Sequence, residues 1–197
     1  MHVFKVLGRG RVRQLDDVVL PAGTGPRHLA FWPPVGRSKY LYLVNQLSNT
    51  VMVFDISSNS LAAAPKLLQE ISTRGKGLPP SAPTIDMNAA EVVVSPDGRF
   101  LIASNRNDTS RPEDTLASYS IDPYSKSKHL TFLNLTGTGG KNPRDHAIDP
   151  TGKYVAIANQ DTGITILERN VRTGKFKGVA ADYPSKSPVA VFWRPFH

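Results

Sequence analysis

Cysteine is absent from this sequence of 197 residues. A chain without thiols has no disulfide framework, no cysteine-based metal site and no cysteine nucleophile. Long hydrophobic runs are also missing: no apolar stretch approaches the length that crosses a membrane, and the first residues, MHVFKVLGRGRVRQLDD, lack the apolar core of a signal peptide. These absences predict a cytoplasmic protein that has no membrane partner.

Acidic residues are fewer than basic residues in this sequence. The sequence holds 24 Lys and Arg residues against 16 Asp and Glu, a net charge of +8. Such an excess suits an anionic partner, whether a phosphate, a carboxylate or a nucleic acid. The densest basic segments, GRGRVR at 8–13 and KSK at 126–128, have no interleaved aromatic residues for base stacking. We interpret them as solvated surface, and we expect a small anionic substrate and no nucleic acid.

Three copies of one phrase run through the sequence, starting at Pro26, Ala89 and Pro143. Each copy reads as an apolar strand, a proline-containing turn, a basic and an aromatic residue, a second apolar strand that ends in Asn, another turn and a third strand. The landmarks are the turn residues Pro33, Pro96 and Pro150 and the strand-end residues Asn45, Asn105 and Asn159. The turn-to-asparagine spacing is 9 residues in the last two copies and 12 in the first, a difference that a hairpin loop tolerates.

The phrase has the chemistry of β-hairpins. In SPDGR and DPTGK, Pro supplies a φ near about −65° and Gly suits a positive φ, between runs rich in β-branched residues such as EVVVS and YVAIA. Each copy continues into a weaker fourth strand, KLLQEIS, LTFLNLT or FKGVAAD. Four antiparallel strands recurring every 50 to 60 residues predict an all-β β-propeller, whose blades pack around a central channel. A β-sandwich does not predict a repeated phrase.

The start of the first strand in each copy is polar. Five residues before the three turn prolines lie His28, Glu91 and Asp145, and Arg27 and Arg144 directly precede two of them. Because the first strand of a propeller blade is innermost, we expect these residues to converge at one end of the channel. A plainer interpretation stays open, namely that polar residues at a strand start satisfy backbone groups in a loop.

In this order, GTGPRHLAFWP, AAEVVVSPDGRFLIASNR and NPRDHAIDPTGKYVAIANQ, followed by SPVAVFW, resemble the seven-bladed propeller lactonases. That family includes the propeller-type 6-phosphogluconolactonases and the fungal 3-carboxy-cis,cis-muconate cyclases. The resemblance covers almost the whole chain but only the C-terminal half of a family member. It implies a partial β-propeller of about four blades' worth of four-stranded sheets, and an anionic substrate handled without metal or cofactor.

Read along the chain, 1–197 is expected to form one partial propeller domain. HVFKV and DDVVL within 1–23 would be the last strands of one blade, 24–80, 81–138 and 139–184 three complete blades, and 185–197 the first strand of a further blade through SPVAVFW. Seven blades of roughly 40 to 50 residues need about 300 residues or more, so two open edges are expected. Either the chain is a truncated product or another chain covers the edges, for which self-association is one route.

Family members line their cleft with the His of the GPRH phrase, the acidic residue of the AAE phrase and arginines near the ends of inner strands. Carried to this sequence, the resemblance implies His28, Glu91 and Arg144 as catalytic residues. The expected substrate-binding residues are Arg27, Arg106, Asp145 and Arg74. In place of the small or amide residue and the aromatic that usually follow PR in the family, this sequence has Asp145 and His146. Strand alternation predicts that His146 packs away from the cleft, while Asp145 adds a negative charge that weakens anion binding.

Lactone hydrolysis needs a base for the attacking water and a cation for the oxyanion. Either Glu91 or His28 would be the base, and the arginines would hold the oxyanion and the phosphate or carboxylate of the substrate. The expected reaction is hydrolysis of 6-phosphogluconolactone. Two alternatives stay open: cyclisation of a carboxylated muconate in the same cleft, and a non-catalytic propeller fragment that serves as an interaction surface.

Overall fold

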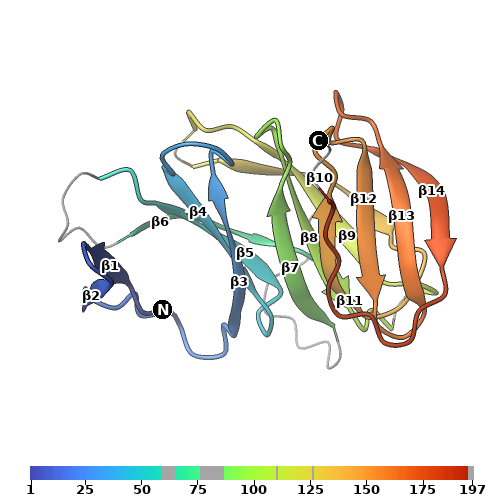
Figure 1. The fold of residues 1–197 in the computed structure, drawn as a ribbon, viewed down its shortest axis with the longest axis horizontal. Helices are drawn as coiled ribbons and strands as arrows, with labels where there is room; N and C mark the ends of the chain where they lie inside the picture. The colour runs from blue at the N-terminus through green and yellow to red at the C-terminus, as the bar shows by residue number, and fades with distance from the viewer. Residues whose placement is uncertain (59–64, 76–86, 110, 126, 195–197) are drawn as a thin grey trace.

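A computed structural model describes residues 1–58, 65–75, 87–109, 111–125 and 127–194 (Figure 1). Its regular structure in these ranges consists of 14 β-strands. They are β1 (Phe4–Leu7), β2 (Arg11–Gln14), β3 (Pro26–Trp32), β4 (Tyr40–Asn45), β5 (Thr50–Asp55), β6 (Lys66–Ser72), β7 (Asn88–Val94), β8 (Phe100–Arg106), β9 (Thr115–Ile121), β10 (Leu130–Gly137), β11 (Pro143–Ile148), β12 (Tyr154–Asn159), β13 (Gly163–Arg169) and β14 (Phe176–Tyr183). None of the described segments is a helix that could span a membrane.

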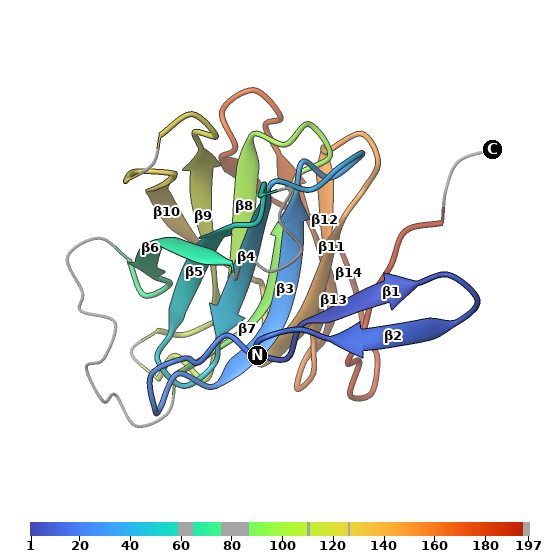
Figure 2. The ribbon, with the colours of Figure 1, turned by 90° about the vertical axis from the view of Figure 1, so that its left-hand side faces the viewer.

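Twelve of these strands form three four-stranded antiparallel sheets, each a simple meander in chain order: β3 to β6, β7 to β10, and β11 to β14. The first strands β3, β7 and β11 lie next to one another in the middle of the molecule, and the later strands fan outward (Figures 1 and 2). Sheets stacked this way are consecutive propeller blades, so the predicted all-β, partial-propeller fold is confirmed. The expected blade boundary at 80/81 lies outside the described residues.

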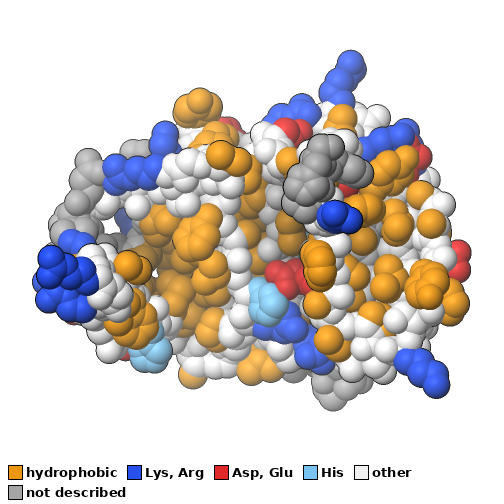
Figure 3. Space-filling model, in the orientation of Figure 1, with side chains coloured by type: hydrophobic (Ala, Val, Ile, Leu, Met, Phe, Trp, Pro, Cys, Tyr) orange, Lys and Arg blue, Asp and Glu red, His pale blue; other side chains and the backbone are white. Residues whose placement is uncertain are grey.

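The N-terminal segment forms the hairpin β1–β2, which stands off from the first blade and carries exposed basic side chains (Figures 2 and 3). The expected second strand DDVVL was wrong, because β2 lies at Arg11–Gln14 instead. Gly8, Arg9 and Gly10 form the loop between Leu7 and its partner Arg11. The positive φ values of Arg9 and Gly10, 61° and 71°, turn the chain so that it pairs directly after them. Val18 and Leu20 instead pack against the buried face of the first blade.

The C-terminal segment 184–194 runs along the third blade without regular strand structure. The expected strand in SPVAVFW was therefore wrong, since a strand needs a hydrogen-bonded neighbour and the described residues place none beside it. Instead the Val191 N–H donates to the Asp145 carboxylate at 2.8 Å, and Trp193 Nε1 donates to the Ala147 carbonyl at 2.9 Å. Val189 and Phe192 stay exposed. Self-association through these ends stays a prediction.

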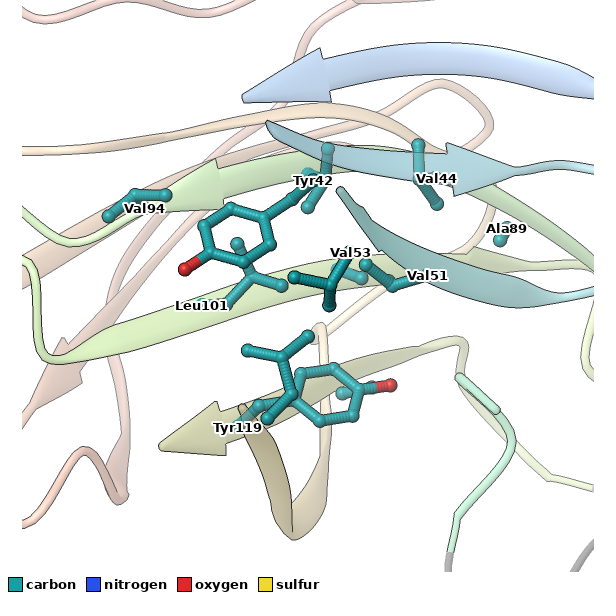
Figure 4. Close-up of a cluster of buried hydrophobic side chains, with 12 residues drawn as sticks. Tyr42, Val44, Val51, Val53, Ala89, Val94, Leu101 and Tyr119 are labelled. Atoms are coloured by element: carbon teal, nitrogen blue, oxygen red, sulfur yellow. The ribbon is translucent and has the colours of Figure 1, made fainter. Parts of the chain in front are cut away.

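Alternation along the strands builds the contacts between blades. Tyr42 and Val53 of the first blade pack against Leu101 and Tyr119 of the second (Figure 4). Ile102, the residue that follows Leu101 on β8, points to the opposite face of the same sheet, where it packs against the third blade. Strand β8 is consequently buried along its whole length. The near-continuous apolar runs of the sequence are thus explained by strands that are covered on both faces.

Candidate functional site

A β-bulge interrupts each inner strand close to its start. The register shifts between Pro26 and His28 in β3, between Ala89 and Val92 in β7, and between Pro143 and Asp145 in β11. A bulge leaves a residue outside the ladder and turns its side chain away from the normal alternation. The residues skipped in this way include Arg27, Glu91 and Arg144. Three of the predicted site residues are therefore aimed by the same local irregularity.

Glu91 and His28 form a pair between the first two blades. The His28 Nδ1 atom faces the Glu91 Oε2 atom, and the side chains are 45% and 10% exposed respectively. The other Glu91 oxygen accepts the Val92 N–H at 3.0 Å. The Glu91 backbone N–H donates to Ser104 Oγ at 3.0 Å, which fixes the bulge against β8. The carboxylate is thus held from two sides, and the histidine is the more accessible partner.

The surroundings of Glu91 disfavour its charged form. Burial is the main cause that raises the pKa of Glu91, and the negative charge of Asp145 raises it further. The Val92 amide and the charges of His28 and Arg27 oppose this rise without cancelling it. A carboxyl group with a raised pKa beside a histidine and an arginine is typical of proton-transfer chemistry.

Three guanidinium groups lie beside this pair. Arg27 Nη1 donates to the Ala90 carbonyl at 2.8 Å, and Arg144 Nη1 donates to Gln160 Oε1 at 3.3 Å. Arg106, at the end of β8, is 7% exposed. Histidine, acidic and basic side chains gather over β3, β7 and β11 in the middle of one face (Figure 3). Six of the seven residues predicted from the sequence come together in this way.

The three arginines repel one another, and the effect falls on Arg106. Burial is the main cause that lowers the pKa of Arg106 to about 10, and the charges of Arg27 and Arg144 lower it further. The charge of Asp114 acts in the opposite direction. Guanidinium groups are cations in proteins, so a cluster of three favours an anionic ligand.

Asp145 and His146 divide as strand alternation predicts. His146 is 1% exposed between the second and third blades, and burial lowers its pKa to about 4. The imidazole is therefore neutral at neutral pH and serves as packing, which confirms its predicted role. Asp145 points to the cluster side, but one of its oxygens is engaged by the Val191 N–H. This hydrogen bond makes Asp145 a tether for the C-terminal segment, and its predicted place beside the substrate stays a prediction.

Arg74 differs from the other predicted residues. It follows β6, the outermost strand of the first blade, and the adjacent Gly75 lies against the side chains of Leu135 and Phe132. Both belong to β10, the outermost strand of the second blade. On the other side of Arg74, the Thr73 carbonyl accepts a hydrogen bond from Asn105 Nδ2 at 2.8 Å, and Asn105 directly precedes Arg106. The loop thus runs from the strand end that carries Arg106 toward β10, and the substrate-binding role of Arg74 stays a prediction. The remainder of this loop, 76–86, is outside the described residues.

Sequence analysis missed Gln160 and Asp114, which contact the site arginines or their loops. A signal for Gln160 was present: it directly follows a strand-end asparagine, as does Arg106. Gln160 Oε1 accepts hydrogen bonds from Arg144 and from Asn142 Nδ2 at 3.2 Å. Asp114 gave no such signal, because its partners lie in its own loop and in the loop before β11. Within the described ranges, no group of three His, Asp or Glu side chains forms a potential metal site.

A model of the lactonase family with a seven-bladed β-propeller matches residues 1–193. The chain belongs to this family. The 6-phosphogluconolactonase of Formosa agariphila is 32% identical over 182 residues, which cover 90% of this chain and 46% of that protein. A Lactobacillus plantarum protein of known structure superimposes with a TM-score of 0.79 at 28% identity, covering 96% of this chain and 50% of its own.

The periplasmic gluconolactonase of Pseudomonas aeruginosa superimposes with a TM-score of 0.72 at 29% identity, over 87% of this chain and 43% of that one. This lactonase-family chain therefore spans about half the length of the relatives it matches. Since one of these relatives is named as periplasmic, the cytoplasmic location expected from the sequence stays a prediction.

Proposed function

We propose that this site hydrolyses a phosphorylated sugar lactone, 6-phosphogluconolactone, to the open acid. The observation that carries the proposal is the pairing of His28 with a buried Glu91 whose pKa is raised, next to three arginines from three blades. A base and a cluster of cations are the two things that attack of water on an anionic lactone requires. The family and the 6-phosphogluconolactonase relative support the same substrate.

The geometry favours His28 as the base. Its Nδ1 atom faces Glu91, so Nε2 is the ring nitrogen left to meet a water molecule, and His28 is far more accessible than Glu91. Glu91 would orient the ring and stabilise the imidazolium that forms, as a carboxylate does in a catalytic triad. For this reason we propose His28, and not Glu91, as the base among the two candidates that the sequence left open.

The proposed hydrolysis has two steps. His28 takes a proton from water while the water oxygen bonds to the lactone carbonyl carbon, and the carbonyl oxygen becomes an oxyanion. An arginine of the cluster stabilises this oxyanion, and the others hold the phosphate, to which guanidinium groups donate in pairs. The ring C–O bond then breaks, and the departing ring oxygen takes the proton back from His28.

Disappearance of 6-phosphogluconolactone above its spontaneous hydrolysis tests the proposal. The wild-type chain should accelerate the reaction, and His28→Asn and Glu91→Gln should each lower kcat/KM by about 10²- to 10⁴-fold, the usual contribution of general base catalysis. His2→Asn is a matched control, because His2 Nδ1 also faces a carboxylate, that of Asp17 at 2.9 Å, in the N-terminal segment.

Equal rates in the wild type, His28→Asn and Glu91→Gln would contradict these roles. Loss of the ultraviolet absorbance of a carboxylated muconate diene, with no lactone hydrolysis, would assign the cleft to a cycloisomerase. Absence of both reactions would leave the chain as a non-catalytic interaction surface.

A further inference from the structure

Asp114 lies between two of the site arginines without belonging to the strands that carry them. It is fully buried in the loop before β9. Its Oδ1 accepts the N–H of Asp108 at 2.7 Å, and its Oδ2 accepts the N–H of Asn142 at 2.6 Å. Asp108 comes two residues after Arg106, and Asn142 comes two residues before Arg144. One carboxylate therefore fixes the backbone next to both arginines.

The backbone of Asp114 strengthens this link between blades. Its N–H donates to the Gly140 carbonyl at 3.0 Å, and its carbonyl accepts the Thr138 N–H at 2.9 Å. Asp114 thus makes four hydrogen bonds, of which three go to the segment that leads into β11. Short hydrogen bonds to a buried carboxylate are stronger than those between neutral groups. The second and third blades are joined at this residue.

The chain on each side turns sharply to present its amide to Asp114. Asn107 has a φ of 58° and Asn142 a φ of 60°, both in the left-handed region that asparagine tolerates better than most residues. Such turns hold a fixed geometry only where the surrounding structure over-determines them. The Asp114 carboxylate supplies this constraint on both sides.

We infer that Asp114 is a positioning residue: it sets the spacing of Arg106 and Arg144, so that guanidiniums from two blades grip one anionic group of the substrate. Asp114 acts through the backbone and does not touch the substrate. The inference rests on the proposed function, since it assumes an anionic substrate at this cluster. The Asp114 charge also offsets part of the repulsion among the arginines, which keeps them close together.

The sign of the effect separates positioning from simple electrostatics. Removal of a negative charge near the cluster should tighten phosphate binding if charge alone mattered. Loss of positioning should weaken it. In Asp114→Asn, the amide NH2 group must face one of the two backbone N–H donors, so one hydrogen bond is lost. In Asp114→Glu the charge stays but the longer side chain displaces the loops.

Binding of inorganic phosphate to the whole chain, measured by calorimetry, tests the inference. Both variants should bind phosphate about tenfold more weakly than the wild type, because guanidinium–phosphate contacts depend on geometry. Asp149→Asn is the matched control: Asp149 is also buried and accepts two backbone N–H groups, those of Thr151 and Tyr154, at the opposite end of β11. This control should keep its phosphate affinity within about twofold, since no arginine of the cluster depends on it.

Equal or tighter phosphate binding by folded Asp114→Asn and Asp114→Glu would overturn the inference, as would a wild type that binds no phosphate. If neither variant folds, amide exchange in the wild type decides: the amides of Asp108 and Asn142 should exchange slowly, and fast exchange would overturn the inference. Phosphate binding is independent of turnover. A wild type that binds phosphate through Asp114-positioned arginines but leaves lactone unhydrolysed would refute the proposed function alone.

Discussion

The two ends of the inner strands are built from similar residues but use them in opposite ways. At the turn end, Asp97 accepts hydrogen bonds from Ser95 and Arg99. In the same way, Asp149 accepts hydrogen bonds from Thr151 and from Tyr154, the first residue of β12. At the starting end, three arginines crowd together and Glu91 is partly desolvated.

Burial and hydrogen bonds lead to opposite pKa shifts at the two ends. Hydrogen bonds to the charged form lower the pKa of Asp97 and Asp149, in spite of their partial burial. Burial instead raises the pKa of Glu91. The turn end therefore stabilises the fold, whereas the starting end retains like charges and a partly desolvated acid. A fold tolerates such local conflict mainly where function requires it.

The largest expected effect comes from substituting one acidic residue at each end of the inner strands, Asp149 at the turn end and Glu91 at the starting end. Asp149→Ala leaves the N–H groups of Thr151 and Tyr154 without their acceptor, so the free energy of unfolding should fall by roughly 3 to 5 kcal/mol. Glu91→Gln should leave it unchanged or higher, because the ionised Glu91 is disfavoured by burial. Urea unfolding at neutral pH measures both. Equal destabilisation by the two substitutions would remove the distinction between the ends.

A second test uses His146, which lies on β11 between the two ends. The pKa of a histidine in the unfolded chain is about 6.5, whereas the pKa of His146 in the folded protein is about 4. Protonation therefore favours the unfolded chain as the pH falls. His146 should thus stabilise the fold above pH 6.5 and lose about 3 kcal/mol of that stability, at most, by pH 4. His146→Phe should flatten this part of the pH dependence. Parallel curves of the unfolding free energy against pH for both proteins would contradict the assignment.

The smallest expected effect concerns Asp145, whose charge raises the pKa of Glu91. Asp145→Asn keeps an oxygen to accept the Val191 N–H while it removes the charge. The acidic limb of the kcat/KM profile should move to lower pH by about one unit or less. Asp182→Asn removes an equal charge from β14, the outermost strand of the third blade, and should leave the limb in place. A limb that moves equally in both variants would assign the shift to net charge.

Much of the fold could be predicted from the sequence because its signals are local. The Pro and Gly residues of the turns near Pro96 and Pro150 act within four or five residues, and the near-continuous apolar runs of β4, β8 and β12 are visible in the sequence. Both errors in strand assignment occurred at the ends of the chain. There a strand depends on a neighbour for pairing, and a pattern of apolar residues does not show whether the neighbour is present.

The repeat also predicted which strand starts would converge, because equivalent positions in stacked blades occupy equivalent places. His28, Glu91 and Asp145 were found in this way, and the arginines that precede two of them were found with them. Arg74 had no equivalent in the repeat, so the repeat could not place it.

The sequence by itself determined the strands, the turns, the blade repeat and the polar character of the inner-strand starts, since each depends on residues close together in the chain. Only the tertiary structure decided how those charges act. The bulges that aim Arg27 and Arg144, the burial that raises the pKa of Glu91 and the hydrogen bonds of Asp114 all involve segments from different strands or blades. Desolvation and long-range hydrogen bonding depend on distances through space, which packing of the blades sets.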